Sequence, residues 1–439
     1  MYLEKQPFLA TWLALFFVTL GFSSAQSPPW ISPPWSDDGE HAQKPIDPLL
    51  AVATGSGIGY IALGDSYGAG IGTEYDGNED KCRLGNHAYT SLIYRDLVKA
   101  WEEDGGGSSK GTPRPVFQWR SCTGATSSDL LGQSGQIASI NGSLPASFAT
   151  LSIGGNDLGF FDVLNSCIFR FYGFYSGTCA AAIRRATNLL DSPAFELSLE
   201  MALLSLLDAA RWEQNPRFSV VVTGYARFFD ARTSACDDRS LGVWLGGPKL
   251  SARLRARLNG LVDDVNARLR NTVRAVNLRF ASRRQRVLFV DYDEKFDGHR
   301  FCEPGVLEPD YQREDTWFFL VGGKDNGGGG EAVMEEEPRR VEAPVVDPDT
   351  CLGPARDSGD WGALALCYMA MAKQRDPSLR LARPVVVDGD DDASAQYTSI
   401  YYAKTFHPRS LGHEAIRDAV YREWKKVFDE DLVHSQEEI

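Results

Sequence analysis

A serine, an asparagine and a histidine stand where apolar runs give way to small or polar residues. Ser66 follows the run 60–63 in Gly-Asp-Ser-Tyr-Gly, and Asn156 follows the run 148–153 in Gly-Gly-Asn-Asp. His407, in Phe-His-Pro, precedes an amphipathic stretch. A serine beside a neutral imidazole can carry out acyl transfer, and an amide can donate to the oxyanion that forms. The three residues therefore suggest the hydrolysis of acyl esters.

Each of these residues taken alone also has a simpler interpretation. Ser66 and Asn156 are common residue types at helix N-termini, and a lone histidine such as His407 is often structural. His413 fits that structural role better, as a residue of the first helical turn or as a hydrogen-bond partner behind the site. The hydrolase interpretation depends on the three residues meeting at one place in the fold.

The surrounding pattern predicts such a meeting place. Short runs rich in β-branched residues predict strands at 60–63, 116–119, 148–153, 218–223 and 287–290. Helix-length segments alternate with them at 88–101, 180–209, 250–276 and 412–428. This alternation predicts a single α/β domain over 58–430, a three-layer α/β/α sandwich around a flavodoxin-like, five-stranded parallel sheet. Such sheets bind ligands at the carboxyl ends of their strands, where Ser66 and Asn156 lie.

Four short blocks, taken together, resemble the signature blocks of the SGNH (GDSL-type) hydrolases. They are residues 64–67, 121–125, 154–157, and 407–408 with 412–413. The resemblance implies that Ser66 is the nucleophile and His407 its base. It also implies that the oxyanion is held by the backbone N–H groups of Ser66 and Gly124 and by the side chain of Asn156. Residues 296–302 resemble a segment of the secreted, disulfide-linked microbial esterases and lipases of this family.

One position departs from the family pattern. Many members carry an Asp three residues before the histidine, where this chain has Lys404. We expect the main-chain carbonyl of Lys404 to orient His407. The alternatives are a carboxylate from the acidic run 388–392 and a catalytically weakened enzyme.

Other readings remain open from the sequence. The segment 64–68 also satisfies the G-x-S-x-G elbow of α/β-hydrolases, although that fold supplies a strand before its serine. Further alternatives are a weak or inactive SGNH-fold binding protein, for example one that recognises carbohydrate, and a carbohydrate acetyl esterase. We expect a small-molecule or lipid ester as substrate, with no metal and no organic cofactor, because a serine, a neutral histidine and three donors suffice for acyl transfer.

Composition and the N-terminus indicate export. Residues 1–25 resemble a cleaved signal peptide, with a membrane anchor as the alternative. No later stretch is long enough to span a bilayer; the best, at 361–371, has about half the length. With 59 acidic and 45 basic residues the chain is unsuited to nucleic acid. We expect a secreted, extracellular protein, most simply a monomer, with no stable membrane insertion.

The expected export also affects how the cysteines are interpreted. Eight cysteines in an oxidising compartment predict disulfides, and we expect pairing in sequence order: Cys82–Cys122, Cys167–Cys179, Cys236–Cys302 and Cys351–Cys367. Asn141 begins a glycosylation sequon. We expect a Pro-rich extended leader at 26–57 and flexible insertions at 104–111 and 322–349. The aromatic segment 168–175 is either core or part of an acyl pocket or lid.

Overall fold

The computed structural model describes residues 57–74, 81–105, 113–173, 177–215, 217–280, 285–327, 346–382 and 399–437. The expected signal peptide, nearly all of the leader and the acidic run 388–392 lie outside these residues. So do 106–112 and 328–345, which make up most of the two expected insertions.

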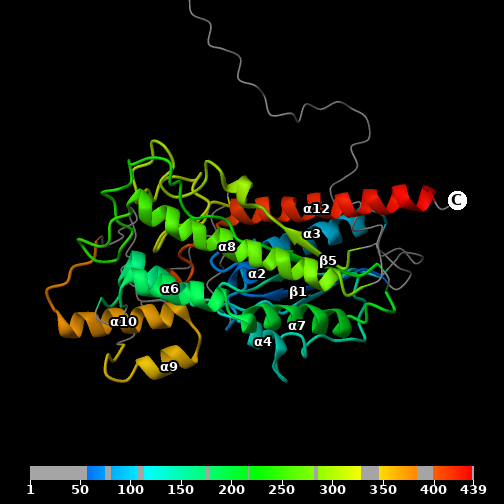
Figure 1. Ribbon diagram of the computed structural model, residues 1–439, viewed down its shortest axis with the longest axis horizontal. Helices are drawn as coiled ribbons and strands as arrows, with labels where there is room; N and C mark the ends of the chain where they lie inside the picture. The colour runs from blue at the N-terminus through cyan, green and yellow to red at the C-terminus, as the bar shows by residue number, and fades with distance from the viewer. Residues whose placement is uncertain are drawn as a thin grey trace, which may run out of the picture. The chain divides into compact units, whose positions relative to one another are not determined.

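Five strands form one parallel sheet in the order β2-β1-β3-β4-β5 (Figure 1). The strands are β1 (Gly59–Gly64), β2 (Val116–Trp119), β3 (Phe148–Ser152), β4 (Ser219–Thr223) and β5 (Val287–Val290). Every neighbouring pair is parallel. This is the flavodoxin-like order, so the predicted fold class is confirmed.

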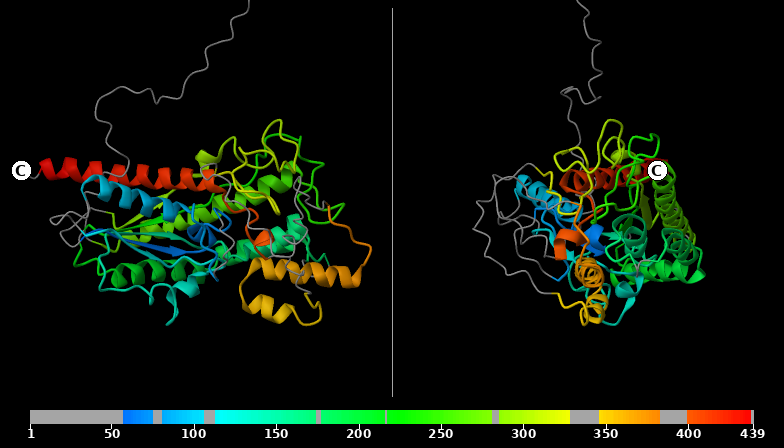
Figure 2. Two further views of the ribbon diagram at one scale, coloured as in Figure 1. Left: turned by 180° about the vertical axis from the view of Figure 1, so that it is seen from behind. Right: turned by 90° about the vertical axis from the view of Figure 1, so that its left-hand side faces the viewer.

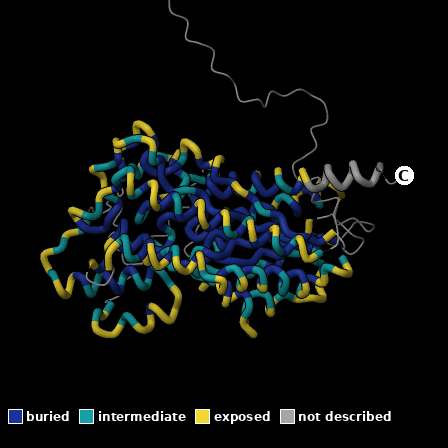
Figure 3. Tube along the Cα trace, in the orientation of Figure 1, coloured by how far each residue is buried: buried dark blue, intermediate teal, exposed yellow. Residues whose placement is uncertain are grey.

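Helices cover both faces of the sheet. On one face lie α3 (Tyr89–Glu103) and α12 (Ser410–Glu437), and on the other lie α4 (Ser127–Leu131), α7 (Pro193–Ala209) and α8 (Ala252–Asn277) (Figures 1 and 2). Because both faces are covered, the strands are almost continuously buried (Figure 3). Tyr60 of β1 stacks between Phe117 and Phe148 of the two flanking strands, with ring centroids 4.9 Å and 4.6 Å away.

The helix predicted at 180–209 is wrong in one respect, because it consists of two helices. These are α6 (Cys179–Leu190) and α7, which begins at Pro193. Ser192 caps α7 by accepting a hydrogen bond from the backbone of Ala194, and proline occupies the first helical position. Proline lacks an N–H and clashes with the preceding turn, so it starts a helix and does not continue one.

Several short elements complete the carboxyl edge of the sheet. They are α2 (Ser66–Ala69), α5 (Phe160–Leu164), a π-helical turn at Asn165–Phe169, a 3-10 turn at Asp293–Phe296 and α11 (Ser399–Ala403). A helical pair not predicted from the sequence, α9 (Leu352–Asp357) and α10 (Trp361–Arg375), lies beyond the sheet at one end of this domain (Figure 1). Within the described residues, no helix has the length and apolar character needed to cross a membrane.

The four disulfides join Cys82 to Cys122, Cys167 to Cys179, Cys236 to Cys302 and Cys351 to Cys367, the pairing expected from sequence order. The described start of the second expected insertion, 322–327, makes well-defined contacts. Asp325 accepts hydrogen bonds from the backbone N–H and the hydroxyl of Ser410, at 2.8 Å and 2.5 Å, and so caps α12. The expected flexibility of 322–349 stays a prediction.

Candidate active site

Ser66 stands at a sharp turn between β1 and α2. The strand ends at Gly64, whose φ is 120°. A Cβ at this position would lie 2.0 Å from the carbonyl oxygen of Ser152 on β3, so only glycine fits between the strands. Asp65 then caps α2 by accepting a hydrogen bond from the backbone N–H of Tyr67 at 3.0 Å. The turn leaves Ser66 as the first residue of the helix, 5% exposed.

Asp65 is held from three directions and thereby fixes the backbone of Ser66. Besides the bond from Tyr67, its Oδ1 accepts from the hydroxyl of Ser152 at 2.9 Å, and its Oδ2 accepts from the hydroxyl of Tyr225 at 2.6 Å. Burial raises the pKa of Asp65 to about 6, although these hydrogen bonds favour the carboxylate. Tyr225 was not singled out from the sequence, because no local motif marks a tyrosine after β4 as a partner of β1.

The structure brings His407 and Ser66 together. His407 Nε2 lies 2.6 Å from Ser66 Oγ, although the two residues are 341 positions apart. On the other side of the ring, Nδ1 lies 3.2 Å from the carbonyl oxygen of Thr405. A carbonyl can only accept, so Nδ1 carries the proton and Nε2 is left to accept from the serine hydroxyl. This is the tautomer that a general base for Ser66 requires.

The expected orienting carbonyl, that of Lys404, lies in the same loop. It accepts a hydrogen bond from the backbone N–H of His407 at 3.0 Å, and it also favours protonation of the imidazole. The Lys404 side chain turns away and places its Nζ 4.9 Å from the centre of the Phe319 ring. Among the described residues no carboxylate is hydrogen-bonded to His407, and the acidic run 388–392 lies outside them.

The electrostatic setting keeps His407 neutral. Burial lowers the pKa of its imidazole to about 4, the Lys404 and Thr405 carbonyls oppose this shift, and the guanidinium of Arg83 adds to it. His413 is buried in the first turn of α12, where its Nδ1 accepts from the backbone N–H of Tyr89 at 3.3 Å. It contributes to packing behind the site, the role expected for it.

Asn156 and Gly124 lie on loops that are tied to each other. The side-chain Nδ2 of Asn156 donates one hydrogen bond to the carbonyl of Ala125 at 2.9 Å, and its second N–H is left for another acceptor. Asp157 holds the start of α4 by accepting from the backbone N–H of Ser127 at 3.0 Å. Within the described residues, no acceptor binds the backbone N–H of Gly124 or of Ser66. These two N–H groups and the Asn156 amide are therefore available to an incoming oxygen.

A small cavity opens at the pair. Its lining includes Ser66, Asn156 and His407, together with apolar side chains from α5, α8, α10 and the segment after β4. One lining residue, Trp361 of α10, lies with its ring centroid 5.7 Å from that of His407. The sequence drew attention to the apolar stretch that starts at Trp361 but gave no reason to place it at the site.

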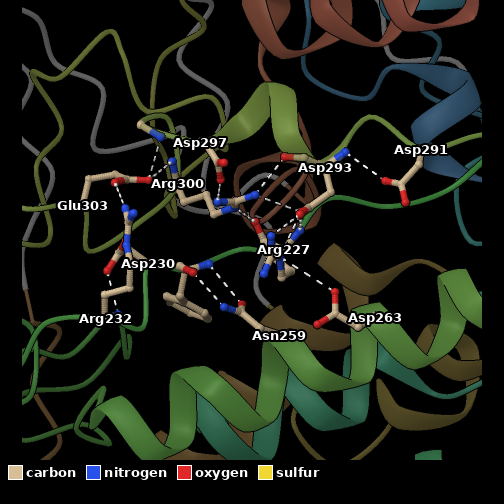
Figure 4. Close-up of polar contacts among 12 residues, drawn as sticks. Arg227, Asp230, Arg232, Asn259, Asp263, Asp291, Asp293, Asp297, Arg300 and Glu303 are labelled. Carbon is tan, nitrogen blue, oxygen red and sulfur yellow. Dashed lines mark hydrogen bonds and ion pairs between the residues drawn. The ribbon is translucent and has the colours of Figure 1, made fainter.

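An ionic network supports the segment after β4, which carries Tyr225 and Phe228 (Figure 4). The guanidinium of Arg227 donates to Asp293 at 2.7 Å, and Asp293 also pairs with Arg300 at 3.0 Å. Asn259 of α8 both donates to and accepts from the backbone of Phe229. The network fixes this segment over α8 without touching the serine.

Other sequence candidates lie apart from the site. Phe169 and Phe171, from the aromatic segment 168–175, are buried and do not line the cavity at Ser66, which favours the core interpretation; residues 174 and 175 lie outside the described residues. The sequon residue Asn141 is exposed. In the described part of the chain, no cluster of His, Cys, Asp and Glu could hold a metal ion.

Comparisons with known proteins place this chain in a family. A lipase of Streptomyces rimosus is 30% identical over 244 residues, which are 55% of this chain and 73% of the relative. Lipase 1 of Streptomyces coelicolor is 28% identical over 246 residues, 56% of this chain and 73% of the relative. The crystal structure of the extracellular Streptomyces rimosus lipase aligns with a TM-score of 0.41 and 26% identity, covering 57% of this chain and 89% of that one. No protein-family model matches the chain.

The doubly wound sheet, with a serine after its first described strand, and the lipase relatives define a carboxylic ester hydrolase. The chain belongs to the SGNH (GDSL-type) hydrolase family. The α/β-hydrolase elbow considered from the sequence is thereby set aside.

Proposed function

We propose that this protein is an exported serine hydrolase that cleaves carboxylic acyl esters, with Ser66 as nucleophile and His407 as general base. The observation that carries the proposal is the 2.6 Å contact between His407 Nε2 and Ser66 Oγ, with a carbonyl on Nδ1. Ser66 N–H, Gly124 N–H and Asn156 Nδ2 would bind the oxyanion. The two lipase relatives favour lipid-like or simple esters as substrates.

The proposed reaction has two halves. Ser66 Oγ attacks the carbonyl carbon while Nε2 of His407 takes the hydroxyl proton, and the carbonyl oxygen becomes an oxyanion. The tetrahedral intermediate collapses, His407 returns the proton to the leaving alkoxide, and an alcohol departs. Water then attacks the acyl-enzyme with the same histidine as base, which releases the carboxylic acid and restores Ser66.

Export is part of the proposal. The expected signal peptide points to the secretory route, and four disulfides suit an oxidising compartment. The disulfide Cys82–Cys122 joins two segments near the site: Arg83 follows its first cysteine, and the Gly124 loop follows its second.

Labelling of the wild-type protein tests the function directly. The mature chain from residue 26 should hydrolyse p-nitrophenyl esters and react once with a fluorophosphonate, and peptide mapping should find the adduct on Ser66. Protein that has already reacted with the fluorophosphonate should lose ester hydrolysis in proportion to the fraction labelled. A folded protein that neither turns over nor reacts would instead support a binding protein on the SGNH fold.

Replacing Asn156 by alanine should lower kcat about 10²- to 10³-fold with little change in KM, because one oxyanion donor is lost and the ground state keeps its contacts. Steady-state kinetics on p-nitrophenyl acetate would measure this. Asn141→Ala, at the exposed sequon, is the matched control. A loss below about tenfold would remove Asn156 from the oxyanion site.

The activity should persist into acid. Because burial lowers the pKa of His407 to about 4, its imidazole stays neutral above that pH and can accept the serine proton. We expect the protonation of His407 to make kcat/KM rise with pH, with a midpoint near pH 4. The pH profile should be recorded in buffers of constant ionic strength. A midpoint near the ordinary imidazole pKa would contradict a fully buried, neutral base.

A further inference from the structure

The cavity beside Ser66 is small and largely apolar. Its volume is about 40 Å³, room for about three or four water molecules, since about 10 to 15 Å³ of such space holds one. One end carries Ser66, Asn156 and His407. The remaining walls include Phe160, Phe228, Trp361 and two valines of α8. An acyl group bound to Ser66 would find room here for its first carbons and little more.

Trp361 lines this cavity from α10, which lies outside the central sheet. It is the first residue of α10, and its ring contacts both the catalytic region and the core: the centroids lie 5.7 Å from His407 and 5.3 Å from Phe161. The two valine walls come from α8, which packs on β5, and Phe228 comes from the stretch after β4. Trp361 is therefore the wall whose size can change with least effect on the sheet.

The helix that carries Trp361 is held in place at its N-terminus. Asp360 caps α10 by accepting from the backbone N–H groups of Gly362 and Ala363, at 2.7 Å and 3.1 Å. The same carboxylate binds both terminal nitrogens of the buried Arg83, one of them at 2.7 Å. Arg83 neighbours the disulfide Cys82–Cys122, and Cys351–Cys367 ties α10 to the start of α9.

Two close backbone approaches limit the movement of this segment further. A Cβ at Gly362 would lie 1.8 Å from the carbonyl oxygen of Ser399, and one at Gly124 would lie 2.7 Å from that of Gly359. The turn before Trp361 thus packs against the loop of a proposed oxyanion donor on one side. On the other side, α10 packs against α11, which leads to His407. The ring is a fixed wall of the cavity.

We propose that Trp361 determines acyl-chain specificity: it ends the acyl pocket and, of the lipid-like and simple esters considered above, restricts the enzyme to those of short-chain carboxylic acids. This rests on the proposed function, because the pocket is defined by Ser66. The alcohol part of the substrate extends toward solvent, while the apolar cavity receives the acyl group. Substrates with longer acyl chains are hydrolysed only when the Trp361 wall is removed.

A chain-length series tests the proposal. Monomeric p-nitrophenyl acetate, butyrate, hexanoate and octanoate are compared for the wild type and Trp361→Ala. Each methylene that can be buried is worth about fourfold in affinity. We expect wild-type kcat/KM to fall at least about tenfold from butyrate to octanoate. Trp361→Ala should abolish this fall, and circular dichroism with thermal denaturation should show that the variant is folded.

Two further variants sharpen the result. Trp212→Ala removes another half-buried tryptophan, which packs on Phe280 away from the cavity, and should keep the wild-type profile. Asp360→Asn preserves a good helix cap but removes the charge that binds Arg83. It should shift the profile toward longer chains by less than Trp361→Ala does, because the ring remains and only its anchor is weakened.

Several outcomes would overturn the proposal. One is a wild type that hydrolyses octanoate as readily as acetate. A second is a Trp361→Ala variant whose kcat/KM rises by the same factor for every ester, because the ring would then limit access to the site and would not select the acyl chain. A third is a variant that tolerates larger alcohols, tested with ethyl, butyl and octyl acetates, but no longer acyl chains. Each of these leaves Ser66-dependent hydrolysis intact, whereas a wild type inert toward every ester removes the proposed function itself.

Discussion

Ser66→Ala is expected to lower kcat on p-nitrophenyl acetate by about 10⁴-fold or more and to abolish fluorophosphonate labelling. In the structure, the hydroxyl of Ser66 is the one placed 2.6 Å from His407 Nε2, so alanine removes the attacking atom and nothing replaces it. Residual catalysis would come from the oxyanion donors alone. The comparison needs initial rates at high enzyme concentration, because small wild-type contamination would mask the loss.

The matched control is Ser219→Ala. Ser219 is as buried as Ser66 but opens β4, at the opposite edge of the sheet from the catalytic pair. This variant should keep wild-type kinetics. Thermal denaturation should show that Ser66→Ala is folded, since one buried hydroxyl contributes about 1 kcal/mol to stability. If Ser66→Ala retained more than about one percent of the wild-type kcat, another residue would have to be the nucleophile.

His407→Ala should cost a similar factor, about 10⁴-fold or more in kcat, because serine and histidine act as one unit and their losses are not additive. Without an acceptor 2.6 Å away, the Ser66 hydroxyl keeps its proton during attack. Fluorophosphonate labelling should slow by a comparable factor although Ser66 is present. Kinetics of the double variant with Ser66→Ala, compared with each single variant, would measure this coupling.

His299→Ala controls for loss of a histidine. His299 stacks on Trp317, with ring centroids 3.7 Å apart, and its Nδ1 lies 2.9 Å from the carbonyl of Asp315. It lines no part of the cavity at Ser66, and we expect unchanged kcat and KM. A His407→Ala variant that retained most of the wild-type activity would mean that the 2.6 Å contact is structural, and the base would have to be sought elsewhere.

The sequence predicted what depends on local pattern. Each predicted strand overlaps an observed one, since a strand buried on both faces is a continuous apolar run that can be recognised without its partners. Ser66, Asn156 and His407 could be proposed because each follows or precedes such an element directly. Pro193 could have indicated the start of a new helix. The apolar residues on both sides of it suggested one continuous helix instead.

Residues that act on the site across long sequence distances could not be predicted in this way. Tyr225 binds Asp65 from 160 positions away, and Arg83 binds Asp360 from 277 positions away. Neither residue lies in a motif, and a tyrosine or an arginine in a loop is ordinary. Trp361 reaches the cavity because Asp360 and two disulfides orient α10. The periodicity of the sequence does not predict this orientation. The family pattern also drew attention to the carbonyl of Lys404. The orientation of the His407 ring places Nδ1 against the carbonyl of Thr405, and the sequence does not determine this orientation.

The wide spacing of the catalytic pair has a consequence during synthesis. Ser66 leaves the ribosome 341 residues before His407, which at about 5 to 20 residues per second is a delay of roughly 20 to 70 s. Throughout that interval the nascent chain holds Ser66 without the histidine that we propose as its base. A chain interrupted before His407 would also lack α12, the helix that packs beside α3 over one face of the sheet (Figure 1). In the proposed mechanism a chain interrupted before His407 would have no base for Ser66, so hydrolytic activity should appear only once the fold is complete.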